Sequence, residues 1–587
     1  MNRRSLFQII GAGSLLAARA GLPAVDGTQL ERKRALAPHC NLFNGDSCTY
    51  FYNPELWQPE GGPYSAKAIH RYVDKLADSG VDTFLINPNA QVAWYPSKKL
   101  QTVIDGYKRG DREFFRGHAI AVGVTPDKME EYLDRQVKFF NLYLDLVDQG
   151  VDWLAETSKA CRTRGISPWV TCRMNDMHGA ANATGSHFNC TLFKQAKFRL
   201  SGRAMDPQDT PHITWMGLNY EHREVRDFML ANIREWMEDY DFDGLELDWL
   251  RQPLCCEPVA GQKQIDMMVD WMREVRSLTE ARARRIGKPV PLGLRVPPNL
   301  GYMKSIGVDV KAQIAAGLVD FVGFSDIWQT TWSVPYDELR KELDPDVVFY
   351  GVVEDAPNWI RGFAPSLAAR STMPSGLGSQ NPGMRLLSAS APMLWANAAG
   401  KLAMGVHGIE QFNFFCTDQG RIPGLRCDYA ALNGTADLAI LRGKPKHYCL
   451  STPSTWMTKV VELPEQLPAV LQPQWRKEFR LSMCAEPSAR KLQLIAQVVI
   501  ENHPHPPRLG VSFNENWPVF ERVETQELLF PNGPYTQHTS DHLGLNFQLD
   551  SEQIKDGWNT LLINNNAKDG DGNAVTIVSV ELGVRPA

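Results

Sequence analysis

The chain has 587 residues, of which 43% are hydrophobic and 22% charged, and its net charge is −5. These proportions are those of a folded globular protein and exclude a disordered or collagen-like chain. The small negative charge gives no reason to expect a nucleic-acid partner or binding to an anionic membrane surface. The length exceeds that of one ordinary domain, so we expect a large domain joined to a smaller one.

The N-terminus has the pattern of an export signal. Arg3 and Arg4 precede a weakly apolar run from Ile9 to Ala18, and small residues around Ala20 suit a signal peptidase. The pattern resembles a bacterial twin-arginine signal over residues 1–20, which predicts a periplasmic or secreted mature protein. The alternative is an ordinary terminus with two chance arginines. No other stretch reaches the ~18 apolar residues of a membrane-spanning helix, so no membrane span is expected.

The eleven cysteines contain no zinc-type Cys-x-x-Cys pair. Cys40 with Cys48, and Cys416 with Cys427, are spaced for loop-closing disulfides in an oxidising compartment. Buried free thiols are the alternative for each. Asp176 lies beside His178, but no third ligand has the spacing of a metal site, so we predict neither a metal nor another cofactor.

Residues 36–448 alternate short apolar runs with longer amphipathic ones, as βα units on a parallel sheet do. Eight strands with helices between them predict a (β/α)8 TIM barrel, an α/β fold. An open doubly wound sheet is the alternative, although no Gly-rich phosphate turn follows the first strand. The expected strands are Asn41–Asn44, Asp82–Asn87, Pro168–Arg173, Gly244–Trp249, Val290–Val296, Phe321–Ser325, Val347–Val353 and Gly408–Phe415. The expected helices include residues 65–79, 127–148, 222–239, 262–286, 306–317 and 388–400.

From residue 450 to 587 the pattern changes to period-two segments separated by Pro, Gly and Asn. This predicts a C-terminal all-β sandwich of jelly-roll type. The segment from Gly557 to Ile563 resembles the last strands of sugar-binding modules, so carbohydrate binding and a purely structural role both remain open. The expected strands are Lys477–Met483, Leu492–Ile500, Leu545–Leu549, Asn559–Ile563 and Val575–Leu582.

The segment 240–252 contains a strand with one apolar and one acidic face. Leu245 and Leu247 alternate with Glu246 and Asp248. If the leucines face the helices, both carboxylates point into the barrel about 7 Å apart, with Asp248 nearer the rim. Charged residues at the C-terminal ends of barrel strands are typical of catalytic sites.

The neighbouring strands carry two arginines that are expected to face the barrel interior, as the two acids do. Arg173 on the third strand and Arg295 on the fifth are expected to flank Glu246, because adjacent strands lie ~4.8 Å apart. This arrangement would keep the pKa of Glu246 low. We therefore predict that Glu246 orients or binds substrate and that Asp248 performs the chemistry. The arginines also leave open an acidic or sulfated sugar.

A glycosidase needs a second carboxyl group, which acts as a proton donor. Glu354 follows the apolar run Val347–Val353 and lies near Trp359, a setting that raises a carboxyl pKa. We predict Glu354 as the acid, with Asp326 as its substitute. For each carboxylate the alternative is a structural role, either capping a helix or pairing with an arginine. The expected sugar-binding residues are Arg173, Asn175, Asp176, Glu246, Arg295, Trp328 and Glu410.

The segment from Phe242 to Trp249 resembles strand four of TIM-barrel glycoside hydrolases and is similar to the chitinase-type pattern Asp-x-x-Asp-x-Asp-x-Glu. Asp243, Glu246 and Asp248 take the first three positions of that pattern. Leu250 stands where the chitinase family has its proton donor. The resemblance therefore does not extend to the chitinase reaction.

A second resemblance is to an uncharacterised family of glycosyl-hydrolase-like barrels. Asn219 and Val225–Asp227 fit the Asn-x-x-x-x-x-Val-Arg-Asp lead-in of that family, and Arg173–Asp176 is similar to its third strand end. In the related α-galactosidase and α-amylase barrels, an Asp that ends strand four is the nucleophile. The resemblance implies that role for Asp248.

The sequence thus predicts a secreted glycoside hydrolase that cleaves a poly- or oligosaccharide with a pair of carboxylates. The first alternative is a non-catalytic polysaccharide-binding protein on an enzyme-like barrel, which Leu250 supports. The second is a polysaccharide lyase, which would need a Lys, Tyr or His base.

Overall fold

The computed structural model describes residues 29–586 except 201–216, 251–253, 258–259, 326–330, 355–388, 413, 415–427, 452–465, 489, 502–506, 520–521, 533–534, 539 and 569–573. The predicted export signal lies outside the described residues, as do Asp326, Trp328, Cys416 and Cys427. The nine described cysteines are free thiols, so Cys40 and Cys48 are not bonded to each other. None of the helices in the described part of the chain has the length and apolar character needed to cross a bilayer.

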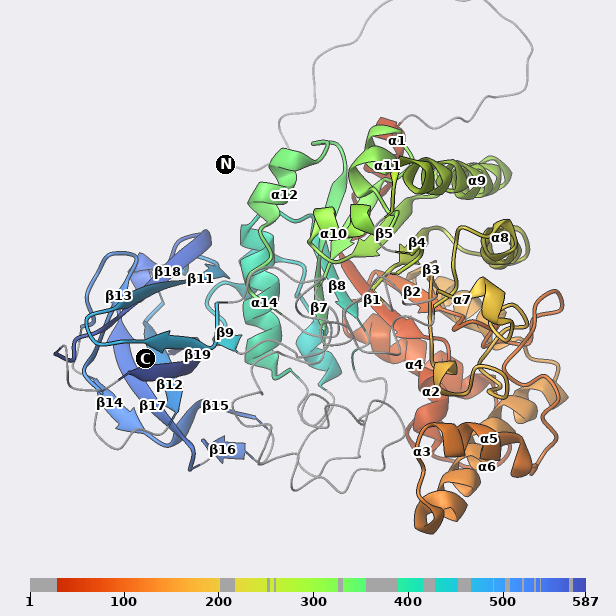
Figure 1. Cartoon of the computed structure of the whole chain (residues 1–587), viewed down its shortest axis with the longest axis horizontal. Helices are drawn as coiled ribbons and strands as arrows, with labels where there is room; N and C mark the ends of the chain where they lie inside the picture. Colours follow the sequence, from red (N-terminus) through yellow and green to blue (C-terminus); the bar gives the residue numbers. More distant parts are fainter. Residues whose placement is uncertain are drawn as a thin grey trace, which may run out of the picture.

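Eight parallel strands close into a barrel in sequence order, which confirms the predicted TIM barrel (Figure 1). Every strand pairs with the next, and β8 pairs with β1. The short apolar runs located each strand correctly, and the strand ends differ from the expected ones by a few residues. The strands are β1 (Asn41–Asp46), β2 (Thr83–Asn87), β3 (Ser167–Arg173), β4 (Leu245–Asp248), β5 (Leu292–Val296), β6 (Phe321–Phe324), β7 (Val348–Glu354) and β8 (Gly408–Phe412).

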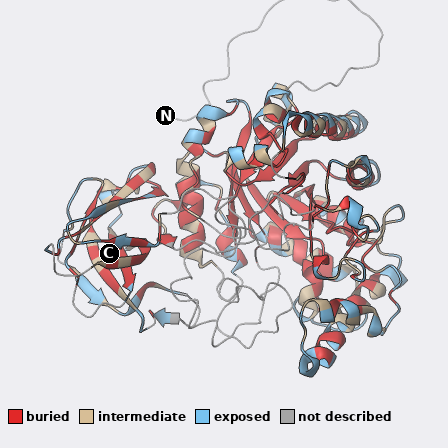
Figure 2. Ribbon diagram, viewed as in Figure 1, coloured by how far each residue is buried: buried red, intermediate tan, exposed pale blue. Residues whose placement is uncertain are grey.

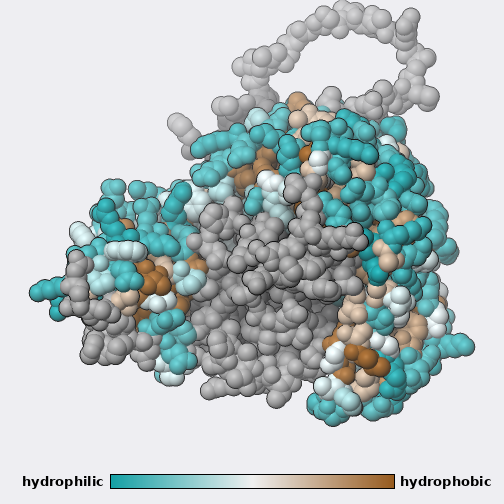
Figure 3. All heavy atoms as spheres, in the orientation of Figure 1, coloured by the Kyte–Doolittle hydropathy of each residue, from teal (hydrophilic) through white to brown (hydrophobic). Residues whose placement is uncertain are grey.

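Helices surround the barrel, and their outer faces are largely hydrophilic on the side that Figure 3 shows. The expected helix 306–317 is shorter than predicted and covers only Val310–Ala315, because Gly307 takes a φ of 97° and the Asp309 side chain caps the helix start. The helices are α1 (Gln29–Ala35), α2 (Thr49–Tyr52), α3 (Pro54–Trp57), α4 (Ala66–Asp78), α5 (Glu113–Ala121), α6 (Pro126–Asp148), α7 (Trp153–Thr163), α8 (Arg223–Asp239), α9 (Gln262–Ile286), α10 (Leu300–Ser305), α11 (Val310–Ala315), α12 (Tyr336–Glu342), α14 (Ala391–Ala403) and α15 (Leu438–Leu441).

The N-terminal end of the barrel interior is closed by a floor of apolar side chains. The rings of Trp169 and Phe321 lie 5.4 Å apart between their centroids and pack with Leu42 and Leu85. Gly293 makes room for this floor, because a Cβ atom there would lie 2.1 Å from the Phe321 ring. The polar residues of the barrel lie above this floor, towards the C-terminal ends of the strands.

The C-terminal residues form two antiparallel sheets whose buried faces enclose a separate core, as the burial colours of Figure 2 show. One sheet has the order β10-β19-β12-β17-β14, with β9 also paired to β19, and the other has the order β11-β18-β13. This confirms the predicted sandwich, although its first strand already begins at Lys446, inside the range expected for the barrel. The strands are β9 (Lys446–Ser451), β10 (Ala469–Leu471), β11 (Arg476–Met483), β12 (Leu492–Glu501), β13 (Leu509–Phe513), β14 (Val523–Thr525), β15 (Glu527–Asn532), β16 (Tyr535–Gln537), β17 (His542–Leu549), β18 (Gly557–Asn565) and β19 (Val575–Pro586).

Helix α14 joins the two domains. It contacts β7 and β8 of the barrel on one side and β9 and β11 of the sandwich on the other (Figure 1). Trp332, Met393 and Ala396 from the barrel domain belong to the hydrophobic core of the sandwich. The Trp558 indole N–H also donates to Asp337 at 3.1 Å. These contacts are those required of a domain that supports the barrel, and carbohydrate binding by the sandwich stays a prediction.

The packed floor predicts the effect of a single added methyl group. Gly293→Ala is expected to lower the free energy of unfolding by about 1–3 kcal/mol, because the methyl group overlaps the Phe321 ring. Gly301→Ala is the matched control, since the nearest atom to a Cβ there lies 3.5 Å away. Urea unfolding of both variants checks this, and a Gly293→Ala protein as stable as the control would contradict it.

Candidate active site

Strand β4 presents two carboxylates to the interior of the barrel. Leu245 and Leu247 belong to the core between the barrel and its helices. Glu246 and Asp248 alternate with them, and their exposed fractions are 0% and 1%. The alternation in the sequence therefore has the meaning we expected, with the leucines outward and the acids inward.

The strand register decides which charges meet. Glu246 pairs across the sheet with Thr171 on β3 and lies level with Gly293 on β5. Asp248 pairs with Arg173 and Arg295. The two arginines thus flank Asp248, one layer above Glu246, and the expectation that they flank Glu246 is wrong.

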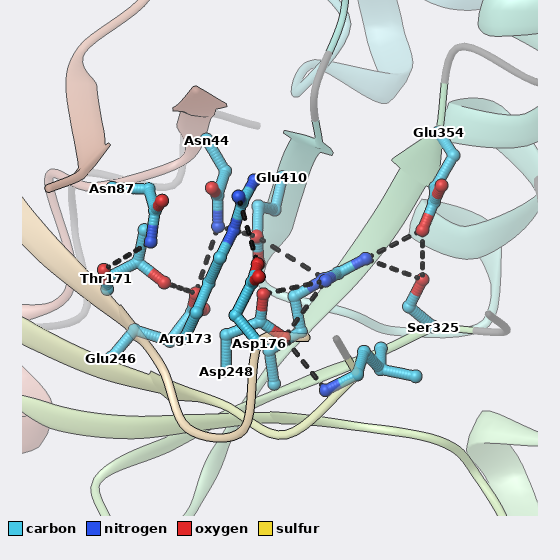
Figure 4. A network of polar contacts seen from close by, with 12 residues as sticks. Asn44, Asn87, Thr171, Arg173, Asp176, Glu246, Asp248, Ser325, Glu354 and Glu410 are labelled. Carbon is cyan, nitrogen blue, oxygen red and sulfur yellow. Dashed lines mark hydrogen bonds and ion pairs between the residues drawn. The ribbon is translucent and has the colours of Figure 1, made fainter. Parts of the chain in front are cut away.

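Arg295 connects two carboxylates at the C-terminal end of the barrel, those of Asp248 and Glu354, which are labelled in Figure 4. Its Nη1 atom lies 3.0 and 3.2 Å from the two oxygens of Asp248, and its Nη2 atom donates to Oε1 of Glu354 at 2.7 Å. The backbone N–H of Leu250 also donates to Asp248 at 2.9 Å. The ring of Phe412 covers the guanidinium, with its centroid 3.4 Å from Cζ. Every side chain of this contact comes from a barrel strand.

The charge of Arg295 is maintained by the acids around it. Burial acts to lower its pKa, but Asp248, Glu354, Glu410 and Glu246 outweigh burial and raise the pKa above its ordinary value. A fully buried guanidinium with several carboxylates is therefore the dominant charge of this half of the mouth.

Arg173 organises the other half of the mouth. It donates to Asp46 at 2.5 Å and to Asp176 at 3.4 Å, and its guanidinium lies 5.2 Å from the centroid of the Trp94 ring. Asp176 in turn holds the His178 ring through Nδ1 at 2.5 Å. Burial opposes the charge of Arg173, but the nearby aspartates raise its pKa overall. Among the described residues, no group of three His, Cys, Asp or Glu side chains is arranged to hold a metal ion.

A second pair of carboxyl groups lies deeper, where Glu246 meets Glu410 from β8. The amide of Asn44 donates to both, at 3.0 Å and 2.8 Å, and the Thr171 hydroxyl donates to Glu246 at 2.7 Å (Figure 4). Burial raises the pKa of Glu410 to about 7. Burial and the charges of Glu410 and Asp248 raise the pKa of Glu246 well above its ordinary value. The low pKa expected for Glu246 is therefore a wrong prediction, and its cause is the register error.

The remaining predicted residues have varied surroundings. Glu354 does end a strand, but its Oε1 atom meets the Arg295 guanidinium and not the apolar setting assumed for an acid. Asn175 lies beyond the end of β3, where its amide bonds the backbone of Leu218 and Leu254 and holds two loops together. Asp326 and Trp328 lie outside the described residues.

Two residues of the site were missed from the sequence. Asn44 and Phe412 occupy neighbouring positions on β1 and β8, with side chains that reach the deep carboxyls and Arg295. Their position in the inward phase of their strands was the available signal. An Asn or a Phe that faces the interior of a strand is usually an ordinary core residue, however, so the inward position alone did not identify them as site residues.

No family model matches the chain. A 118-residue stretch is 31% identical to the 1,4-alpha-glucan branching enzyme of Prochlorococcus marinus, covering 17% of this chain and 14% of that enzyme. A 98-residue stretch is 37% identical to the same enzyme of a Jannaschia species, covering 16% of this chain and 12% of that one. The chain thus matches less than a fifth of the length of these curated relatives.

Three solved structures to which the chain is similar are named as a glycoside hydrolase domain, an alpha-amylase and an alpha-L-fucosidase. The glycoside hydrolase domain of PgaB from Bordetella bronchiseptica is 8% identical, with a TM-score of 0.35 over 65% of this chain and 95% of that one. The maltogenic alpha-amylase AmyB from Thermotoga neapolitana is 10% identical, with a TM-score of 0.34 over 92% and 98%. The alpha-L-fucosidase isoenzyme 2 from Paenibacillus thiaminolyticus is 11% identical, with a TM-score of 0.38 over 70% and 51%.

Removing the central cation tests the charge balance of the site. Arg295→Met is expected to lower the free energy of unfolding by about 3–5 kcal/mol near pH 7, because Asp248 and Glu354 are left buried without their guanidinium. The loss should shrink at acid pH, since a protonated carboxyl needs no counter-charge.

Arg164→Met provides the control for that variant. Arg164 also pairs with two carboxylates, those of Asp74 and Asp78, but on the solvent-exposed surface. We expect little change in stability, because exposed ion pairs contribute little. Denaturation of both variants at several pH values measures the difference. A loss for Arg295→Met that is small, or that does not depend on pH, would contradict this description of the site.

Proposed function

We propose that the protein is a glycoside hydrolase that cleaves a poly- or oligosaccharide with the carboxyl pair Asp248 and Glu354. The observation that carries the proposal is the contact of both carboxylates with one buried guanidinium at the C-terminal ends of barrel strands. Active sites of TIM-barrel enzymes lie at this end. The export pattern of residues 1–20 supports a periplasmic or secreted location as part of the same proposal.

The separation of the two carboxyl groups suits hydrolysis of a glycosidic bond. Asp248 and Glu354 contact the same planar guanidinium, so their bonded oxygens lie no more than about 8 Å apart. This limit falls within the roughly 6.5–9.5 Å that separates the carboxyls of inverting glycosidases and also admits the shorter spacing of retaining ones.

Asp248 is the proposed nucleophile or base. Two N–H groups of different origin, from Arg295 and from the Leu250 backbone, stabilise its negative charge and fix its orientation. It would attack the anomeric carbon directly or take a proton from the attacking water.

Glu354 is the proposed acid. In the resting site it pairs with Arg295 as a carboxylate, so it would first take up a proton from water and then pass that proton to the leaving oxygen of the sugar. Its Oε1 atom accepts from Arg295, so the transferred proton would leave from Oε2. Asp326, which follows Ser325 at the end of β6, is the substitute acid.

The proposal predicts a specific pattern of lost activity. We expect Asp248→Asn to reduce release of reducing sugar by more than about 10³-fold, because the carboxylate that forms or assists the new bond is gone. Glu354→Gln should lose about 10²–10⁴-fold on natural glycans but little on glycosides with a good leaving group, which needs no proton. The measurement is a panel of plant, algal and bacterial polysaccharides together with aryl glycosides. Full activity of Asp248→Asn would move the chemistry to another residue.

Arg173 and Arg295 are both already paired with carboxylates, which supports a substrate without an acidic group at the reacting sugar. Asp46, Asp176, Asp248 and Glu354 neutralise Arg173 and Arg295. An anionic or sulfated sugar would add negative charge to a group of residues in which carboxylates already outnumber the described cations. We accordingly disfavour the acidic sugar that the arginines suggested in the sequence.

This substrate preference can be measured directly. We expect kcat/KM for a neutral hexoside to exceed that of the matching uronide at least tenfold at pH 7. The comparison uses aryl glycosides that differ only at the carboxyl group. Faster cleavage of the uronide would contradict the preference but not the hydrolase activity.

A non-catalytic polysaccharide-binding protein is the second candidate. It is favoured by the observation that Asp46, Asp176, Asp248 and Glu354 each pair with an arginine, as structural carboxylates do. A binding protein would retain glycans on the same panel without releasing reducing sugar.

A further inference from the structure

Beneath Arg295, the barrel holds a carboxyl pair that the proposed cleavage does not use. Glu246 and Glu410 are both 0% exposed, and their carboxyl groups are within hydrogen-bonding reach of each other. They share one amide donor, that of Asn44. The Oε2 atoms of both have no donor among the described residues. Two carboxylates so close in a dry interior cannot both ionise without a counter-charge.

The surroundings of the pair do not supply that counter-charge. Arg295 is the cation facing the pair within the described residues, and its Nε atom lies 4.0 Å from Glu410. Its other nitrogens already bond Asp248 and Glu354. The neighbouring Asp248 repels both members of the pair.

Every other strand contributes neutral groups at this level. Thr171 on β3 donates a hydroxyl, and Gly323 on β6 has no side chain, which leaves room for Oε2 of Glu410. Asn87 on β2 bonds the backbone of Thr171 and does not reach the pair. On β7, Tyr350 has a pKa raised by burial and stays neutral.

We propose that Glu246 and Glu410 hold one proton between them and act as positioning residues that keep Arg295 directed at Asp248 and Glu354. When Glu410 loses its proton, an added negative charge appears below the guanidinium and competes for it with the two carboxylates above. The effect on turnover rests on the proposed function, whereas the shared proton itself does not.

The direction of the pH dependence follows from the burial of the pair. Burial raises the pKa of both carboxyls, that of Glu410 to about 7, so the Glu410 proton is held in acid and lost near neutrality. We therefore expect the loss of this proton to contribute to the alkaline limb of kcat. The alkaline limb should be weaker in KM, because both carboxyls are 0% exposed and lie below the Arg295 guanidinium.

Glu410→Gln tests the positioning role. The amide keeps the shape of a protonated carboxyl but cannot ionise, so the alkaline limb of kcat should move up by about one pH unit or more. Glu235→Gln is the matched control, because Glu235 is also buried but bonds Tyr95 and Ser97 outside the barrel. An alkaline limb that is identical in wild type and Glu410→Gln would overturn the positioning role.

Stability against pH tests the shared proton without any substrate. Above the ordinary carboxyl pKa of 4.5 the unfolded chain releases the Glu410 proton, whereas the folded chain keeps it until about 7. The folded state therefore binds more protons in this window, and its stability falls as the pH rises. The thermal midpoint of wild type should fall more steeply from pH 4.5 to 7 than that of Glu410→Gln, and parallel profiles would overturn the shared proton.

Infrared spectroscopy tests the shared proton in the wild-type protein, so the result does not depend on whether a variant folds. At pH 6 we expect a carboxylic-acid C=O absorption from the pair, which should weaken as Glu410 ionises near neutrality. Its absence at pH 6 would overturn the proposal. If the absorption and the stability window are found in a protein that cleaves no glycan, the shared proton stands and the proposed hydrolase fails.

Discussion

The contact of one buried guanidinium with several carboxylates is the constraint on which the site depends. Arg295 is 0% exposed, and removing such an ion from water costs several kcal/mol unless other groups compensate its charge. Asp248 and Glu354 provide the compensation, so neither is free to take another orientation. The same requirement places two carboxyl groups from β4 and β7 at a defined separation.

Polarity increases in layers from the floor of the barrel to its mouth. The rings of Trp169 and Phe321 close the bottom without any charge. The pair of Glu246 and Glu410 comes next, and its raised pKa values reflect the lack of a cation at that depth. The layer of Arg295 follows, where each charge has an opposite partner. Helix α14 backs β7 and β8 and packs against the sandwich, so the second domain supports the strands that carry Glu354 and Glu410.

The sequence was sufficient for the fold because periodicity reports which face of a strand is buried. The predicted strand Gly244–Trp249 differs from the observed β4 by one residue at each end, and the expected helix 262–286 is the observed α9. The alternation of Leu245 and Leu247 with the two acids also gave the direction of the side chains.

The register between neighbouring strands could not be predicted from the sequence in the same way. The alternation of side chains along β3 and β5 correctly placed Arg173 and Arg295 inside the barrel. Their height along the barrel axis depends on the hydrogen-bond register between strands, which aligns them with Asp248. This offset of two residues reverses the expected pKa direction of Glu246. The partner of Glu354 was missed for a related reason, because the apolar residues before it say nothing of Arg295, which lies 59 residues away in the sequence. Asn175 was predicted to face the barrel interior like Arg173, but β3 ends at Arg173, so the alternation of a strand no longer applies at position 175.

The most direct test is the crystal structure of Asp248→Asn bound to an oligosaccharide that the wild-type protein cleaves or binds. The account predicts an occupied barrel mouth, with the anomeric carbon facing position 248 and the glycosidic oxygen within hydrogen-bonding distance of Oε2 of Glu354. Arg295 should keep its contact with Glu354 in the complex. A sugar bound only on the sandwich, or in the mouth with its glycosidic bond directed away from Glu354, would contradict the account.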